Sequence, residues 1–98
     1  MARWDAELRF AIANKRLLQC RYDTRVRIAE PHDYGLLHGA PKLLVYQLRG
    51  GRSPVPDWRL LDVSKIDELV VLEQTFRGSR REAHQHHHQW DTLFARVE

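Results

Sequence analysis

The sequence has few of the features that mark secreted or membrane proteins. Cys20 is its only cysteine, so no disulfide can form within the chain. No apolar run approaches the length of a membrane span, and Asp5 and Glu7 stand where a signal peptide would be apolar. Free thiols are usual in the cytoplasm. We therefore expect a cytoplasmic chain that binds no membrane, with its 98 residues forming one domain, residues 1–98.

Sequence motifs for catalysis are also missing. The chain has no paired-carboxylate motif, no nucleophile elbow and no glycine loop of the P-loop type. The Gly50-Gly51 pair is more simply explained as the flexible start of a loop. Cys20 has no histidine beside it in the sequence, and free cysteines in apolar segments usually pack as small core residues. The sequence thus predicts no enzyme activity and no cofactor.

A short histidine-rich run, HQHHHQW, is the only candidate for metal binding. On a helix, His84, His88 and Asp91 would share one face at spacings of i, i+4 and i+7. A histidine pair at i, i+4 can bind zinc or another transition metal. No thiol or further histidine cluster completes a ligand set, so we expect a solvated helix face and no metal. The charge of such a face would change near pH 6 to 7, where histidine titrates.

Positive charge is unevenly distributed along the chain, although the net charge is only +3. Residues 1–59 carry 11 Lys and Arg against 6 Asp and Glu, a balance of +5, and residues 60–98 carry 5 against 7, a balance of −2. If the first half formed one face, its field would attract nucleic acid or nucleotides. The simpler interpretation is a solvated surface whose charge is uneven.

Hydrophobic periodicity divides the chain into a helix, five short strands and a second helix. Trp4, Leu8, Ala11 and Ile12 recur at helical spacing, which predicts a helix over about residues 5–14. Alternating or apolar runs predict strands at 17–22, 25–31, 43–49, 58–63 and 68–76. Turn residues predict loops at 32–42 and 50–57 and a short connector at 64–67.

The expected fold is α+β, with a small five-stranded antiparallel barrel over about residues 16–76. Short antiparallel strands commonly close into a barrel because closure removes exposed edges. Sm/SH3-like and OB-like barrels are the candidates, with the helices covering an open end or a flank. Capping-box spacing of Ser79 and Glu82 begins the second helix, at about residues 80–97. Its apolar stripe would comprise Ala83, His86 or His87, Trp90, Leu93, Phe94 and Val97.

The order of these segments resembles the WYL domain, a small Sm/SH3-like barrel found in many bacterial proteins. The resemblance covers roughly residues 10–76. Its motifs are the helix end Ala11-Ile12, the strand Leu17 to Tyr22, the arginine strand RVRIAEP, the strand LLVYQLRG, the segment RLLDVSKI and the final strand ending at Phe76. The tripeptide that names the family is replaced by Leu43-Leu44-Val45-Tyr46, and Lys65 stands where the family usually has Arg.

The resemblance implies a sensing role. WYL domains commonly follow a winged helix-turn-helix in transcription regulators, and they are regarded as sensors of nucleic-acid-type ligands that can regulate partner proteins. Only about ten residues precede the expected barrel, too few for such a DNA-reading domain. By resemblance we expect a ligand-sensing regulatory module that binds a nucleotide or a single-stranded nucleic acid and acts on a separate partner protein or a second copy of the chain.

The candidate binding residues are basic and aromatic. Arg25 and Arg27 lie two residues apart in a strand, so they share a face, and Val26 and Ile28 would then point into the core. Two guanidiniums on one face can clamp phosphates bidentately. Arg59 and Lys65 match the family's basic positions, and His32 adds a donor after Glu30-Pro31. Three aromatic residues are candidates for base stacking, namely Tyr34, Tyr46 and Trp58. Tyr46 has the parity of a core residue, whereas Tyr34 and Trp58 lie in or beside expected loops and are the better candidates for contact with a ligand.

An alternative function remains open at this point. The chain could be a structural or protein-interaction module, including a homodimer, in which the arginines only solubilise the surface. A concave pocket where the four basic groups converge would favour the anion site. A contiguous apolar patch with dispersed arginines would favour the interaction module.

Overall fold

The computed structural model describes residues 3–81 and 89–98. In chain order the elements are α1 (Asp5–Ala13), β1 (Arg16–Tyr22), β2 (Arg25–Leu37), β3 (Ala40–Gly50), β4 (Asp57–Asp62), the 3-10 turn η1 (Val63–Lys65), β5 (Ile66–Thr75) and β6 (Thr92–Arg96). The helix and all five strands predicted from the sequence are therefore present, and the predicted connector falls on η1 and the residues beside it. A sixth strand was not predicted.

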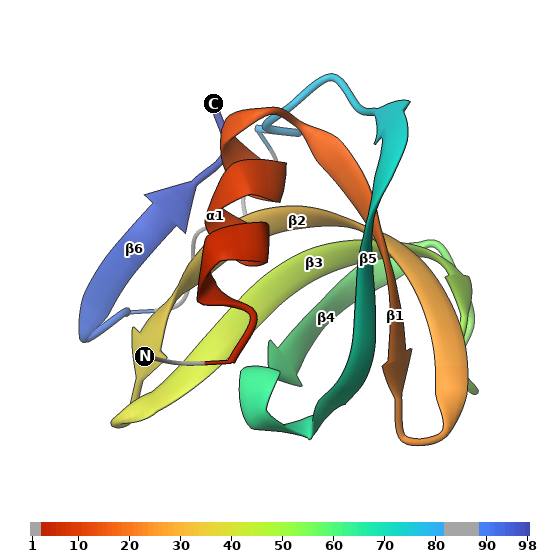
Figure 1. The fold of residues 1–98 in the computed structure, drawn as a ribbon, viewed down its shortest axis with the longest axis horizontal. Helices are drawn as coiled ribbons and strands as arrows, with labels where there is room; N and C mark the ends of the chain where they lie inside the picture. Colours follow the sequence, from red (N-terminus) through yellow and green to blue (C-terminus); the bar gives the residue numbers. More distant parts are fainter. Residues whose placement is uncertain (1–2, 82–88) are drawn as a thin grey trace.

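The strands form one antiparallel sheet in the order β4-β3-β2-β1-β5, with β6 added to β2 (Figure 1). The sheet curls strongly, but β4 and β5 remain its two edges and no backbone pairing joins them in the described chain. The prediction of a closed five-stranded barrel is therefore wrong. The three-residue turn η1 connects the two edge strands β4 and β5. The curled sheet thus has an inner face and an open end.

The predicted loop over residues 32–42 is also wrong. β2 continues to Leu37 and turns back tightly into β3 at Ala40. Pro31 was expected to end the strand, yet it lies between the stretch of β2 that pairs with β1, which reaches Ala29, and the stretch that pairs with β6, which starts at Asp33. The pairing with β3 shifts register at the same place. Proline is tolerated where no neighbouring strand needs its missing N–H group and where a bulge interrupts the ladder.

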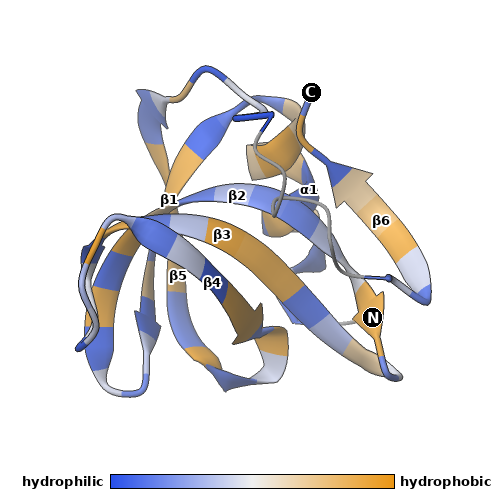
Figure 2. Ribbon diagram, turned by 180° about the vertical axis from the view of Figure 1, so that it is seen from behind, coloured by the Kyte–Doolittle hydropathy of each residue, from blue (hydrophilic) through white to orange (hydrophobic). Residues whose placement is uncertain are grey.

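The core lies between α1 and the inner face of the sheet. Leu8, Ala11 and Ile12 of the helix are at most 2% exposed, and α1 packs against β1, β2 and β6 (Figure 1). The central part of β3 is hydrophobic on both faces, as the continuous orange stretch in Figure 2 shows. Leu43 and Val45 belong to the main core, whereas the buried Leu44 alternates with them and faces the outer side of the sheet.

The C-terminal segment does not form the predicted helix over about residues 80–97. Residues 92–96 form strand β6, and residues 79–81 and 89–91 are not helical. Phe94 and Val97 pack on the core in the structure, as the predicted helix would also have required. The apolar pattern of this segment is therefore compatible with a helix and with a strand. The second half of β2 extends beyond β1, so its backbone offers a free edge, and pairing with this edge outweighs local helix propensity.

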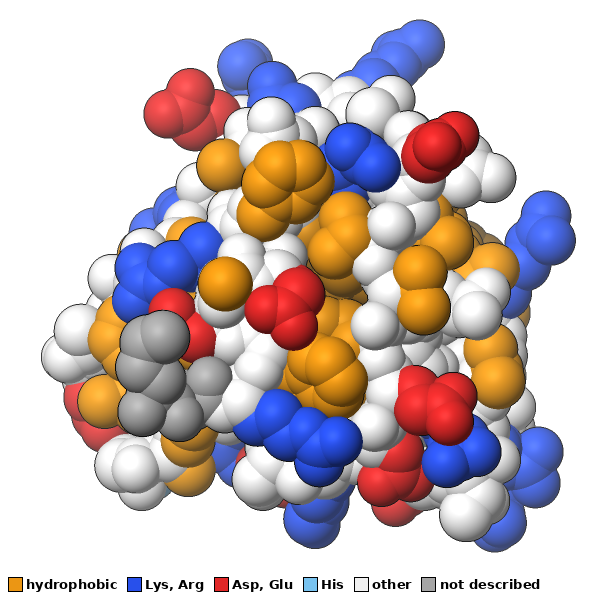
Figure 3. Space-filling view, viewed as in Figure 1, with side chains coloured by type: hydrophobic (Ala, Val, Ile, Leu, Met, Phe, Trp, Pro, Cys, Tyr) orange, Lys and Arg blue, Asp and Glu red, His pale blue; other side chains and the backbone are white. Residues whose placement is uncertain are grey.

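The face that carries α1 and β5 mixes charges of both signs. In Figure 3 acidic and basic side chains surround hydrophobic ones on this side, with no region of a single sign. No helix in the described part of the chain is long and apolar enough to cross a membrane. The positive excess of the first half is thus not gathered on this face.

Candidate functional site: a basic pocket at the open end of the sheet

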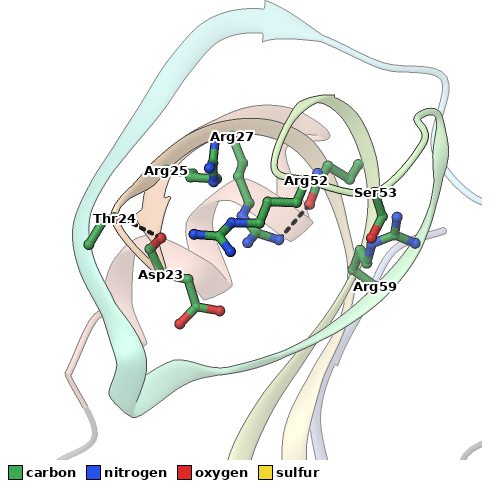
Figure 4. Close-up of a pocket in the computed structure, with 8 residues that line it drawn as sticks. Asp23, Thr24, Arg25, Arg27, Arg52, Ser53 and Arg59 are labelled. Carbon is green, nitrogen blue, oxygen red and sulfur yellow. Dashed lines mark hydrogen bonds between the residues drawn. The ribbon is translucent and has the colours of Figure 1, made fainter.

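A pocket of about 480 Å³ opens at the end of the curled sheet where β1 turns into β2 and β3 leaves for β4. We call it the basic pocket. Its lining residues are Asp23, Thr24, Arg25, Arg27, Gln47, Arg52, Ser53 and Arg59 (Figure 4). Four guanidiniums and one carboxylate thus line a concave space of a size that suits a small ligand.

Arg25 and Arg27 reach this pocket from the inner face of β2. Arg27 pairs across the strands with Cys20, which is 4% exposed and belongs to the core. The expectation that the two arginines share a face agrees with the structure. The expectation that Val26 and Ile28 point into the core is wrong. Val26 is 56% exposed on the outer face, and Ile28, two residues further along the strand, shares that face and does not belong to the core. At an open end the inner face still reaches water, so a long side chain can pack its stem inside and keep its charge solvated.

Arg27 is held rigidly at the base of the pocket. Its Nη1 donates to Gln47 Oε1 at 3.1 Å, and its Nη2 lies 3.5 Å from the Tyr22 carbonyl oxygen. The guanidinium also lies 5.0 Å from the centre of the Tyr22 ring. Its buried Nε has no hydrogen-bond partner in the described chain. Arg27 therefore presents an oriented positive charge that is only partly satisfied by the protein.

Gln47 and Gly51 make this arrangement possible. Gln47 is fully buried and uses its Nε2 to donate to the Gly50 carbonyl oxygen at 2.8 Å, which orients Oε1 toward Arg27. Gly51 has a φ of +75°, and a Cβ there would lie only 2.7 Å from Gln47 Nε2. The Gly50-Gly51 pair is thus a close-packed backbone turn beside the pocket, which the sequence alone suggested to be only a flexible loop start.

Arg59 forms the opposite wall and is also held in place. Its Nη1 donates to Asp57 Oδ2 and to the Trp58 carbonyl oxygen, both at 2.9 Å, and its Nη2 donates to the Pro54 carbonyl oxygen at 3.1 Å. Asp57 is exposed, so this ion pair is weakened by water and offsets only part of the positive charge.

Arg25 and Arg52 behave differently from these two. Both are exposed, and neither side chain forms a hydrogen bond or an ion pair with any residue that the structure describes. Arg52, Asp23 and Gln47 were not predicted as site residues. Arg52 and Asp23 lie in turns, where the sequence pattern assigns no face, and Gln47 was taken as part of an ordinary strand. The one sequence feature that could have indicated Arg52 as a site residue is its place after a glycine pair, in the GGR sequence that follows an apolar strand.

Four of the seven residues proposed from the sequence lie outside the basic pocket. Lys65 is in η1, with a side chain that is 64% exposed and 3.5 Å from Asp62 Oδ2. His32, Tyr46 and Trp58 lie together on the outer face of the sheet. Tyr46 and Trp58 pack edge to face at 5.1 Å, and His32 meets the Trp58 ring at 4.8 Å. Side chains alternate along a strand, so Tyr46 and Trp58 point away from the side that carries Gln47 and Arg59.

Glu30 and Arg80 complete this outer cluster, which comprises Glu30, His32, Tyr46, Trp58 and Arg80. Arg80 makes a bidentate contact to Glu30 with two distances of 2.8 Å, and it lies 3.8 Å from the centre of the Tyr46 ring. His32 Nε2 lies 3.1 Å from Glu30 Oε1. Burial raises the pKa of Glu30, but hydrogen bonds from His32 and Arg80 outweigh burial and lower that pKa below its usual value. These charges are mutually satisfied, so the outer cluster is a structural network.

Nothing in the described chain supports metal or thiol chemistry. Burial raises the pKa of Cys20 to about 11, so the thiol stays protonated at neutral pH and packs in the core. No group of metal-binding residues occurs in residues 3–81 and 89–98. His84 and His88 lie outside the described residues, while Asp91 accepts a hydrogen bond from the Gly39 backbone N–H at 2.8 Å.

Comparisons of the chain with protein-family models, with curated proteins and with solved structures found no match.

Proposed function

We propose that the chain is a ligand-binding module whose basic pocket takes the phosphate groups of a nucleotide or of a single-stranded nucleic acid. The observation that carries this proposal is that Arg25 and Arg52 reach a concave pocket without any partner in the described chain. Together with Arg27 and Arg59, they place four guanidiniums opposite one carboxylate. Such a concentration of like charge is stabilised when an anion enters.

The pocket combines two fixed and two adaptable cationic groups. Arg27 and Arg59 are already oriented by hydrogen bonds, so little side-chain entropy is lost when they contact a ligand. Arg25 and Arg52 can move to follow the shape of the anion. Guanidinium matches phosphate oxygens bidentately, and charge-assisted hydrogen bonds of this kind are about twice as strong as neutral ones.

In this proposal the pocket recognises the phosphate and not the base. Its lining residues include no aromatic side chain, and Tyr46 and Trp58 pack edge to face against each other on the outer face. Base stacking is therefore not part of the proposed site. Phosphate contacts position a ligand without reading its sequence, so we expect affinity that depends little on the base.

The resemblance to WYL domains supports a regulatory use of this binding. In that proposal the chain senses the anion and transmits its occupancy to a separate partner protein or to a second copy of itself. The hairpin that carries Arg25 and the loop that carries Arg52 are surface elements, which suits a site whose occupancy a partner detects.

The proposal is tested by fluorescence anisotropy with short single-stranded oligonucleotides and with nucleotides over a range of salt. Arg52→Glu should weaken binding by at least tenfold. Arg49→Glu is the matched control, because Arg49 is also exposed and without a partner in the described chain but lies outside the pocket. Its effect should stay below about threefold. The slope of log affinity against log salt should be about 0.7 per phosphate contacted.

Two results would contradict the proposal. Equal losses in both variants would show that a diffuse positive field, and not the pocket, attracts the ligand. A folded wild-type protein that binds no nucleotide or oligonucleotide at low salt would remove the anion site altogether.

A second candidate function is a protein-interaction module, and the outer face of β1, β2 and β5 favours it. Val26 and Val70 are 56% and 51% exposed there, and the register places Ile28 and Val70 on either side of Gln19. Val70→Lys should then abolish an oligomer detected by sedimentation without changing phosphate binding. A wild-type chain that sediments as a monomer at high concentration would exclude the homodimer form of this function.

A further inference from the structure

Asp23 is the one acidic residue among the lining residues of the basic pocket. Its side chain makes no hydrogen bond or ion pair with any described residue, although four arginines line the same pocket. In Figure 4 its carboxylate points into the opening, at the side opposite Arg59. The Asp23 carboxylate is therefore available as a hydrogen-bond acceptor for a ligand that enters the pocket.

Asp23 stands in a tight turn at the edge of the pocket. Asp23 and Thr24 have φ values of 51° and 62°, and Tyr22 pairs with Arg25, so they form a two-residue hairpin turn with both φ angles positive. Asn-Gly and Asp-Gly are the preferred pairs for such a turn, so aspartate and asparagine both suit the first position, whereas threonine adopts a positive φ only with strain. The two residues that suit the position of Asp23 differ in charge, and aspartate is the one that gives the pocket a negative group.

The charge of Asp23 limits which anions the pocket can accept. A carboxylate is only a hydrogen-bond acceptor, so it repels a phosphate and favours a ligand that carries a donor close to that phosphate. The ribose hydroxyls of a nucleotide are donors of this kind. Carboxylates bind ribose hydroxyls in dinucleotide sites, and the 2′-hydroxyl lets proteins distinguish RNA from DNA.

We propose that Asp23 makes the basic pocket selective for phosphates attached to ribose over those attached to deoxyribose. The arginines take the phosphate, and the Asp23 carboxylate accepts a hydrogen bond from a ribose hydroxyl. This inference rests on the proposed phosphate-binding function and adds the sugar as the specificity determinant. The same chemistry is present in a free ribonucleotide and in single-stranded RNA.

The test compares matched ribo- and deoxyribo-oligonucleotides of one sequence and length, and the corresponding nucleoside 5′-monophosphates, in buffer with a chelator. Wild-type protein should bind the ribose form of each pair about tenfold more tightly, as expected for a hydrogen bond to a charged group. In Asp23→Ala, deoxyribose ligands should bind more tightly than they bind wild type, and the ratio should fall to about one. Asp23→Asn keeps the turn and should give an intermediate ratio.

The outcomes separate this inference from the function on which it rests. Equal binding of both sugars by wild type overturns the role of Asp23 while phosphate binding stands. A ribose preference that persists in a folded Asp23→Ala variant, or one that requires magnesium, also overturns it. Absence of all binding overturns the phosphate site itself. Preference only in the oligonucleotides would identify RNA, and preference in both pairs would identify the shared ribose-phosphate unit.

Discussion

Arginines in two regions of this molecule have different partners. In the C-terminal part, Arg80 and Arg96 each meet a buried carboxylate through two hydrogen bonds, to Glu30 and Asp33. In the basic pocket, Arg25 and Arg52 meet no partner in the described chain. Arg27 contacts only neutral groups, and Arg59 shares its charge with one exposed aspartate.

The difference separates arginines that compensate buried carboxylates from arginines that compensate none. Asp33 is fully buried, and an uncompensated carboxylate there would be costly, so Arg96 is needed for stability. The pocket arginines compensate no buried charge. Replacing a pocket arginine should therefore change stability much less than replacing Arg96 does.

Arg96→Met should lower the free energy of unfolding by about 3–5 kcal/mol, because it removes two charge-assisted hydrogen bonds from the fully buried Asp33 carboxylate. Chemical denaturation measures the loss. Arg52→Met is the control and should stay within about 0.5 kcal/mol of wild type. The double variant Asp33→Asn with Arg96→Met should recover part of the loss. An unchanged midpoint in Arg96→Met would show that the ion pair does not support β6.

Arg80→Met should have a smaller effect, about 1–3 kcal/mol, because Glu30 keeps its hydrogen bond with His32. The loss should depend on pH in a defined direction. Because the pKa of Glu30 is lowered by folding, its contribution is complete above the usual value of 4.5 and is lost as pH falls through the lower folded-state pKa.

Denaturation of wild type and Arg80→Met from pH 7 to pH 3 tests this dependence. The difference between the two stability curves should shrink as pH falls through the lowered folded-state pKa of Glu30. Arg77→Met, which replaces an exposed neighbour, should follow the wild-type curve throughout. Parallel curves for wild type and Arg80→Met would contradict a role for the Glu30 charge.

Thr24→Gly should raise the free energy of unfolding by about 1 kcal/mol, because glycine adopts the positive φ of this turn without strain. The hairpin between β2 and β3 provides the internal comparison. There His38-Gly39 occupies the equivalent positions and already contains a glycine, so Gly39→Thr should destabilise by a similar amount. The melting temperatures of the two variants should shift in opposite directions. A lower melting temperature for Thr24→Gly would show that the backbone of Thr24 is not strained.

The smallest effect is expected for removal of the unpartnered arginines. Arg25→Ala with Arg52→Ala should change stability by less than about 0.5 kcal/mol while removing the phosphate binding described above. Denaturation and anisotropy on the same preparation measure both. A large loss of stability would show that these arginines support the fold, as Arg80 and Arg96 do.

Several elements of the fold could be predicted from the sequence. The helical spacing of Leu8, Ala11 and Ile12 and the alternating apolar residues of β1 are local patterns, and the structure confirms them. The failures all involve distant partners. The second half of β2 was taken for a loop because its ladder depends on β3 and β6, and residues 92–96 were taken for a helix because only the free edge of β2 favours a strand.

The candidate site also contains residues that local patterns predict and residues that they do not. The shared face of Arg25 and Arg27 follows from the two-residue period of a strand, and the structure places both in the basic pocket together with Arg59. His32 and Trp58 could not be assigned to a face from the sequence, because the bulge near Pro31 and the pairing of β3 with β4 decide which side they occupy. Tyr46 had the parity of a core residue, but it lies in the outer cluster and outside the main core. Asp23 and Arg52 lie in turns, whose direction no periodicity predicts.

The sequence by itself determined the local structure of this protein: one helix, five short strands, an uneven distribution of charge and the face shared by two arginines. Periodicity and turn residues encode these features within a few neighbours. Only the tertiary structure decided that the sheet stays open, that β6 joins it, and that arginines from a hairpin, a loop and an edge strand surround one pocket. Those outcomes depend on backbone edges and packing between segments far apart in the chain, where burial and hydrogen bonding outweigh local preference.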